Sequence, residues 1–129
     1  MSTYLAPRFE TLTIPAASGV SNWVAIANAP NFIPAWLEFP AAWTGATPQL
    51  YFEHATSTAV PGGADARSVG LLDGVSTELL IPFVALRTVF LPAGNFAGLM
   101  WLRIGAGTSA APVVQAADRV VKLGRREFT

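Results

Sequence analysis

Gly105, Gly107 and Ala110 are the residues of this chain whose spacing comes nearest to a known chemical motif. They follow the apolar stretch LMWLRI in the pattern G-x-G-x-x-A, as in a loop that binds a dinucleotide. That chemistry also needs a helix whose N-terminus faces the pyrophosphate and a further parallel strand. Pro112 would interrupt such a helix, and the chain ends soon afterwards, at Thr129. The sequence therefore predicts a tight loop between antiparallel strands and no nucleotide cofactor.

A histidine and its polar neighbours could be drawn as a hydrolytic triad. His54 ends an alternating stretch, and Ser57 and Asp65 follow it. A serine nucleophile also needs a strained turn and an oxyanion hole, and no G-x-S-x-G sequence occurs here. Glu53 and Glu78 could be paired as glycosidase carboxylates, but each falls in a strand pattern, where a solvent-facing glutamate is expected. We predict no enzymatic activity and place His54 at a surface or an interface.

The residue types that bind metals are sparse. The chain has no cysteine and a single histidine, which argues against zinc–thiolate and histidine-rich sites. Asp65, Asp73 and Glu78 are the acidic residues in or beside a long loop, but their spacings of eight and five residues are unlike the alternate-position ligands of calcium loops. We predict no cofactor, and leave open whether the loop over residues 55–74 holds a structural ion.

Composition indicates one domain with an apolar surface. The chain has 129 residues, of which 52% are hydrophobic and only 12% charged, and its formal net charge is zero. This length suits a single core, and a weakly charged neutral surface favours assembly with copies of itself or with a large partner. We find neither a secretion-type N-terminus nor an uninterrupted apolar run long enough for a membrane span, so we expect a product of the cytoplasm with no membrane partner.

The strands that must position these residues are short, because Pro and Gly recur throughout the chain. Alternation is clearest over residues 49–54 (QLYFEH) and 99–104 (LMWLRI). Further strands are predicted over residues 9–14, 23–27, 36–39, 77–81, 87–91 and 118–123. We therefore predict an all-β fold, a single β-sandwich or jelly-roll-like domain over residues 1–129 with about eight strands. Residues 1–8 are expected to be an N-terminal arm and residues 124–129 a C-terminal tail.

Two sets of side chains could serve either the core or a surface. Tryptophans fill cores or form exposed platforms for sugars and partners, and we predict core filling for most of the four, with Trp43 at a rim because it lies in the turn-rich AAWTGATP. The C-terminal end is basic, with Arg119, Lys122, Arg125 and Arg126. No aromatic residues interleave these charges, so a solvated tail is predicted and no nucleic-acid partner.

Two stretches carry motif-like blocks, residues 40–52 (PAAWTGATPQLYF) and residues 96–123 (FAGLMWLRIGAGTSAAPVVQAADRVVKL). The matching residues are Ala42, Trp43, Thr44, Leu50 and Phe52 in the first block, and Phe96, Gly98, Arg103, Gly107, Thr108, Pro112, Gln115, Ala116, Ala117 and Arg119 in the second. These blocks, about a third of the chain, resemble those of a group of small tailed-phage and prophage structural proteins. The chain departs from that pattern at Gly105, where a serine is common, and at Val114, where an asparagine is common. Pro48 is an inserted residue.

The resemblance implies a non-enzymatic virion component with a β-sandwich fold, and we take it to be a capsid decoration protein on the outer surface of the head. Its partners would be the major capsid protein and sister subunits, for which a trimer would suit the neutral surface. We expect the contacts in the N-terminal segment over residues 2–9 and in the turns over residues 43–48 and 59–70. The individual residues predicted there are Tyr4, Phe9, Trp43, Thr44, Pro48, Pro61 and Arg67, with Arg125 and Arg126 at the C-terminus. The alternatives are a carbohydrate-binding sandwich on a tail fibre or head fibre and a structural tail or adaptor protein.

Overall fold

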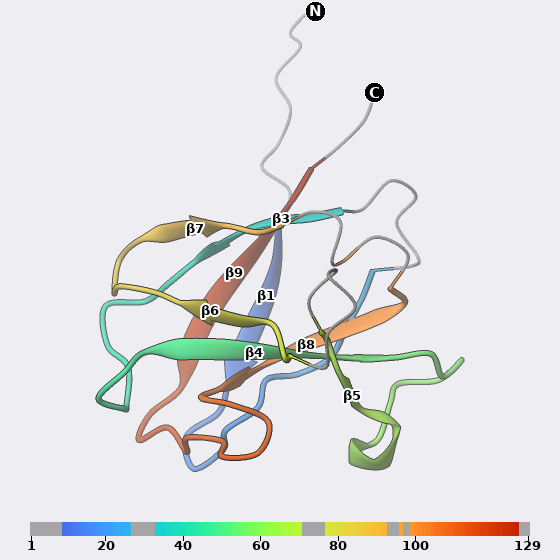
Figure 1. Ribbon diagram of the computed structural model, residues 1–129, viewed down its shortest axis with the longest axis horizontal. Helices are drawn as coiled ribbons and strands as arrows, with labels where there is room; N and C mark the ends of the chain where they lie inside the picture. The colour runs from blue at the N-terminus through green and yellow to red at the C-terminus, as the bar shows by residue number, and fades with distance from the viewer. Residues whose placement is uncertain (1–8, 27–32, 71–76, 93–95, 97–98, 127–129) are drawn as a thin grey trace, which may run out of the picture.

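The computed structural model describes residues 9–26, 33–70, 77–92, 96 and 99–126, and it confirms an all-β sandwich of two antiparallel sheets (Figure 1). We call the first sheet A; its strand order is β1 (Phe9–Ile14), β9 (Arg119–Arg126), β3 (Ile33–Glu38) and β7 (Thr88–Phe90). Sheet B has the order β2 (Val24–Ala25), β8 (Trp101–Ala106), β4 (Gln49–Ala55) and β5 (Arg67–Ser68), and β6 (Leu80–Pro82) also pairs with β4. The described part of the chain holds one helical turn, the 3-10 segment η1 (Gly63–Asp65).

The core lies between the sheets because the inward residues of each strand alternate with outward ones. Leu12 and Ile14 of β1 and Leu50 and Phe52 of β4 belong to one buried cluster, which also includes alternate residues of β8 and β9. Phe96 closes one end of this cluster by packing edge-on against Phe52, with ring centroids 4.8 Å apart. The alternation predicted for β4 and β8 therefore corresponds to a real inward and outward division.

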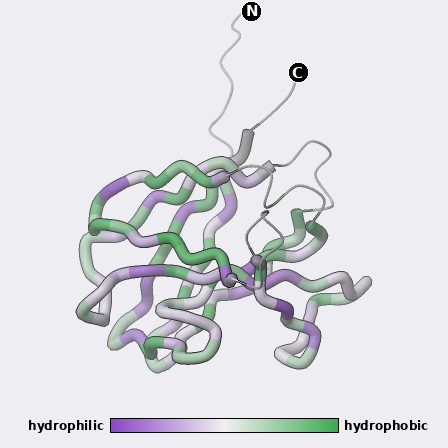
Figure 2. The backbone as a smooth tube through the Cα atoms, in the orientation of Figure 1, coloured by the Kyte–Doolittle hydropathy of each residue, from purple (hydrophilic) through white to green (hydrophobic). Residues whose placement is uncertain are grey.

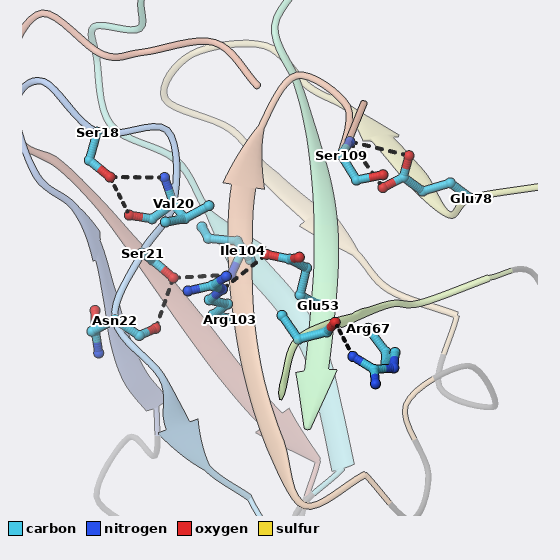
Figure 3. A network of polar contacts seen from close by, with 11 residues as sticks. Ser18, Val20, Ser21, Asn22, Glu53, Arg67, Glu78, Arg103, Ile104 and Ser109 are labelled. Atoms are coloured by element: carbon cyan, nitrogen blue, oxygen red, sulfur yellow. Dashed lines mark hydrogen bonds and ion pairs between the residues drawn. The ribbon is translucent and has the colours of Figure 1, made fainter. Parts of the chain in front are cut away.

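The connection from β1 to β2 is fixed to sheet B by a buried serine. The Ser21 hydroxyl accepts a hydrogen bond from the backbone N–H of Ile104 (3.0 Å) and donates one to the carbonyl of Asn22 (2.9 Å) (Figure 3). The backbone N–H of Ser21 in turn donates to the carbonyl of Ile104 (2.9 Å). This connection therefore reaches sheet B without leaving the Ser21 hydroxyl or the Ile104 amide unpaired.

Each sheet has one glycine in a central strand that lies beneath an aromatic ring. A methyl group at Gly124 of β9 would overlap Cε2 of Trp36 and the two carbons bonded to it, so the ring presents its face, not its edge, to the glycine. A methyl group at Gly105 of β8 would overlap the ring and hydroxyl of Tyr51 in the same way. The cross-strand pairs Trp36–Gly124 and Tyr51–Gly105 explain these contacts, since paired residues stand side by side on one face.

The strand bounds differ from the predicted ones at several places. β9 runs to Arg126, through half of the segment predicted as a tail over residues 124–129, because Gly124 continues the ladder with both β1 and β3. β3 begins at Ile33, before the predicted start at residue 36, and it includes Pro34. A register shift between Pro34 and Trp36 accommodates the proline. β2 is only two residues long, and β5 and η1 lie in the stretch predicted to be irregular. The predicted arm over residues 1–8 lies outside the described residues.

The ionisation of the Tyr51 hydroxyl is coupled to folding because the side chain is buried. Burial, together with the nearby Glu53 carboxylate, raises the pKa of Tyr51 to about 12 from its ordinary value of 10.0. The fold therefore favours the neutral phenol. The stabilisation that the neutral phenol of Tyr51 gives is fully present below its pKa in the unfolded state. It is lost as the pH rises from there through its pKa in the folded state.

We expect the free energy of unfolding to fall more steeply between about pH 10 and about pH 12 in the wild type than in Tyr51→Phe. Urea unfolding of both proteins at a series of alkaline pH values measures this difference. Tyr4 is present in both proteins and cancels from the comparison. Parallel declines in the two proteins would contradict a raised Tyr51 pKa.

Candidate functional site

One end of the sandwich presents apolar side chains from two adjacent loops. The connection from β3 to β4 and the turn from β6 to β7 lie side by side, because the Leu86 N–H donates to the Pro40 carbonyl (3.3 Å) and the Phe39 N–H to the Arg87 carbonyl (3.1 Å). Figure 2 colours β6 and the turn after it mostly as hydrophobic. We call the exposed apolar residues of these loops the apolar tip; they are Ala41, Ala42, Ala46, Pro82, Val84 and Leu86.

Leu86 is the most unusual residue of the apolar tip. Its side chain is 75% exposed, and its backbone is in the left-handed region with a φ of 61°. Glycine and asparagine adopt that conformation readily, whereas a leucine there costs on the order of 1 kcal/mol. Val84, two residues earlier, is 61% exposed. An apolar side chain thus occupies an exposed turn position that local backbone energetics would assign to a small or polar residue, which is a reason to look for a contact there.

The apolar tip rests on a stack of aromatic rings. The Phe83 ring is parallel to Phe39, with centroids 3.8 Å apart and an interplanar angle of 2°. Trp43 meets the same Phe83 ring edge-on at 4.8 Å and 86°. Trp43, which the sequence placed at a rim, is therefore the tryptophan that packs against the core. The prediction of core filling is wrong for Trp23, Trp36 and Trp101, which are half-buried and lie outside the core cluster.

A buried glutamine anchors the loop that carries Trp43. The Gln115 side chain is only 1% exposed. Its Oε1 accepts from the Thr44 N–H (2.9 Å), and its Nε2 donates to the carbonyls of Thr44 (3.1 Å) and Val113 (3.2 Å). The amide thus completes the backbone hydrogen bonding of Thr44 as a neighbouring strand would. It fixes the connection from β3 to β4 against the connection from β8 to β9.

Thr44 and Arg119 complete this anchor. Arg119 donates from Nε to Oε1 of Gln115 and from Nη2 to the Thr44 hydroxyl, both at 3.1 Å. The same hydroxyl accepts from the N–H of Ala116 (3.1 Å). The side chain of Thr44, which was predicted as a contact residue, therefore makes hydrogen bonds within the protein. We call Thr44, Gln115 and Arg119 the polar anchor.

The end of the molecule that carries β5 and η1 holds the residues of the supposed triad. His54, Ser57, Asp65 and Arg67 line one pocket of about 220 Å³ with Ala55 and Thr56. The Ser57 hydroxyl donates to the Ala59 carbonyl (2.8 Å), and Asp65 Oδ2 accepts from the Gly62 N–H (2.9 Å). Nδ1 of His54 is buried and has no hydrogen-bond partner. The pocket gathers these residues without joining the histidine to the serine or to the aspartate.

The two glutamates considered as a glycosidase pair serve structural contacts. Glu53 Oε1 accepts from Nε of Arg103 at 3.0 Å (Figure 3). The guanidinium carbon of Arg103 lies 4.4 Å from the centre of the Trp23 ring. Glu53 is largely buried, so its predicted solvent-facing position is wrong; its cross-strand partner Arg103 covers it. Both carboxylate oxygens of Glu78 lie within hydrogen-bond distance of the Ser109 N–H, at 3.2 and 3.3 Å.

The loop that mimics a dinucleotide fingerprint is a tight turn. Gly107 has a φ of 86° and forms an isolated bridge with Pro112, and the Ala111 N–H donates to the Thr108 carbonyl (3.1 Å). The strands on either side of this connection do not pair with each other, because β8 belongs to sheet B and β9 to sheet A. The chain crosses between the sheets here, and the polar anchor fixes that crossing.

The described residues contain no group of three or more histidine or acidic side chains placed to hold a metal ion. Asp73, one of the three residues considered for calcium, lies outside the described part of the chain. No helix among the residues described is long and apolar enough to cross a membrane.

The remaining predicted contact residues are scattered. Phe9 is half-exposed at the start of β1, with the Lys122 ammonium 5.0 Å from its ring centre. Pro48 is half-buried and Pro61 is buried. Arg67 is exposed and donates to the carbonyls of Ala64 and Ala66 (3.1 and 2.9 Å). Tyr4 lies outside the described residues, and Arg125 and Arg126 pair through their backbone with Pro34 and Ile33 of β3.

Two surface features were missed by sequence reasoning: the apolar tip at Val84 and Leu86, and the cross-strand pair of the half-buried Trp36 with the exposed Phe90. Residues 82–86 (PFVAL), which end β6 and form most of the turn to β7, are all apolar, and this is an available signal because turns are usually polar. No family model, curated protein or solved structure matches this chain.

Replacement of Gln115 tests the polar anchor. Gln115→Ala removes four side-chain hydrogen bonds and leaves the Thr44 backbone groups without their partner, so we expect a loss of about 2–4 kcal/mol in the free energy of unfolding. We also expect faster hydrogen exchange at Thr44 than in the wild type. Val114→Ala, at the exposed neighbouring position, is the control and should change stability by less than about 0.5 kcal/mol. Equal stability of the two variants would contradict the anchor.

Proposed function

We propose that this chain is a non-enzymatic structural protein of a tailed-phage virion, a capsid decoration protein that binds the major capsid protein lattice and stabilises the head. The motif blocks at residues 40–52 and 96–123 support the virion assignment. The polar anchor joins the two blocks in space, through Thr44 of the first and Gln115 and Arg119 of the second. The residues that carry the resemblance therefore act as one structural unit.

The apolar tip is the observation that carries the attachment role. Val84 and Leu86 are exposed on loops that are held by backbone hydrogen bonds, an aromatic stack and the polar anchor. Rigid apolar contacts bind with little loss of conformational entropy, which suits a protein that must attach at many equivalent lattice positions. The low charge of the chain suits close packing with sister subunits, as in a trimer. The protein would be made in the host cytoplasm and act at the capsid surface, without a nucleic-acid or membrane partner.

The stoichiometry of the protein in purified virions tests this role directly. We expect it in fixed proportion to the major capsid protein when virion components are quantified by mass spectrometry, and at regularly repeated lattice positions in cryo-EM maps. A few copies confined to a vertex or to the tail would contradict decoration and would favour a tail or adaptor protein instead.

Leu86→Asn separates attachment from folding. Asparagine tolerates a positive φ, so we expect a melting temperature equal to or slightly above that of the wild type. Loss of the apolar side chain should weaken attachment to capsids that lack the protein by about tenfold or more, as measured by co-sedimentation.

Val60→Asn is the matched control, because Val60 is 72% exposed but lies between β4 and η1, toward the opposite end of the sandwich (Figure 1). We expect it to attach as the wild type does. Attachment that is lost in Val60→Asn and kept in Leu86→Asn would place the contact in the predicted turn over residues 59–70 and overturn the assignment to the apolar tip.

A further inference from the structure

We propose that the groove between Trp36 and Phe90, on the outer face of sheet A, is a saccharide-binding subsite. The groove has a volume of about 290 Å³ and is lined by Trp36, Glu38, Thr88 and Phe90. It lies on the face of the sheet rather than at the apolar tip, and the proposal does not depend on attachment to a capsid.

The indole of Trp36 forms a fixed platform. One face of the ring covers Gly124, as the overlap of a methyl group there with Cε2 and its two bonded carbons shows. The residue also lines the groove, so part of the indole is open to a ligand. Glycine at position 124 is what allows the ring to lie down on the sheet, since any side chain would lift it. The orientation of the platform is therefore set before a ligand arrives.

Strand pairing sets the other groups around the platform. Phe90 of β7 is directly opposite Trp36 of β3, and Thr88 is opposite Glu38. Phe90 is 77% exposed, and Glu38 and Thr88 are also exposed. Glu38 is two residues along β3 from Trp36, a distance of about 7 Å at the usual rise of a strand. An aromatic pair and a polar pair thus form adjacent rows of one groove.

This arrangement matches the chemistry of a sugar ring. A pyranose has an apolar face of C–H groups that packs against an aromatic ring and a rim of hydroxyl groups that need hydrogen-bond partners. The Glu38 carboxylate accepts hydrogen bonds, and the Thr88 hydroxyl both donates and accepts them. A ring stacked on Trp36 would reach both groups with hydroxyls on one side.

A neutral saccharide fits better than a single-stranded nucleic acid. Bases also stack on aromatic rings, but their phosphates require a positively charged groove. Here the charged residue that lines the groove is Glu38, which would repel phosphate. Lys122, the cross-strand neighbour of Glu38 on β9, has its ammonium over the Phe9 ring, 5.0 Å from the ring centre. Neutral hydroxyl-rich ligands are therefore the class we assign.

Binding is tested with the full-length protein against neutral oligosaccharides, namely an array of hexose and N-acetylhexosamine oligomers, followed by NMR titration of the strongest binder. We expect a saturable shift of the Trp36 indole N–H resonance together with the amides of Glu38, Thr88 and Phe90. Phe90→Ser and Glu38→Gln should each weaken binding by about five- to tenfold, because the first removes an aromatic contact and the second replaces a charged acceptor by a weaker neutral one. Neither residue is buried.

Two controls keep the outcome specific. Val120→Ser changes another exposed residue of the same sheet face, away from the groove, and Leu86→Asn changes the apolar tip; both should bind sugar as the wild type does. Failure of every oligosaccharide on the array would overturn the proposal, as would binding that Phe90→Ser and Glu38→Gln leave unchanged. Shifts of the Trp36 resonance that follow protein concentration rather than sugar, or that appear only with a single-stranded oligonucleotide, would also overturn it. Loss of capsid attachment in Leu86→Asn with normal sugar binding would separate the two proposals.

Discussion

The hydrogen bonds of the Gln115 side chain are the constraint on which the end of the molecule with the apolar tip depends. A buried amide must satisfy both its donor and its acceptor atoms, and Gln115 does so almost entirely with the backbone of Thr44 and Val113. The connection from β3 to β4 is thereby fixed to the crossing between the two sheets. Trp43, next to Thr44, is held where its ring meets Phe83, and Phe83 begins the turn that presents Val84 and Leu86. The turn with Val84 and Leu86 is thereby connected, through Phe83 and Trp43, to a loop that the Gln115 side chain holds by hydrogen bonds.

The outer faces of the two sheets have different physical characters. On sheet B, Arg103 lies between the Trp23 ring and the Glu53 carboxylate, and Tyr51 covers Gly105 and is itself buried. On this face, the charges of Arg103 and Glu53 are therefore paired with each other. On sheet A, Trp36 covers Gly124, but its row continues to the exposed Phe90, and the next row has the exposed Glu38 and Thr88. An aromatic ring lies over a glycine on both sheets, but the ring is buried on sheet B (Tyr51) and lines a groove on sheet A (Trp36).

Much of the fold follows from the sequence, because alternation in single strands is a local property. The stretches that became β1, β4 and β8 show it plainly, and the all-β class and the sandwich are confirmed. Features that depend on distant residues could not be predicted. A register shift lets Pro34 lie inside β3, and the Trp36 ring lies flat on the outer face of sheet A because its partner on β9 is a glycine. Nothing in the sequence around Gln115 indicates that it is buried, because the partner that it binds, Thr44, is distant in the chain. The left-handed conformation of Leu86 likewise has no local sequence signal.

Several residues of the two motif blocks make internal contacts, although Ala42 of the first block is also part of the apolar tip. Thr44, Gln115 and Arg119 bond to one another, and Phe52 packs against Phe96, so these matched positions are occupied with internal contacts. Leu86 and Phe90 belong to neither block, and their side chains point into solvent. Substitution at these two positions should alter binding while the sandwich persists, whereas substitution in the polar anchor should alter the sandwich first. The partner of the proposed virion protein is therefore to be identified mainly from exposed residues outside the two blocks.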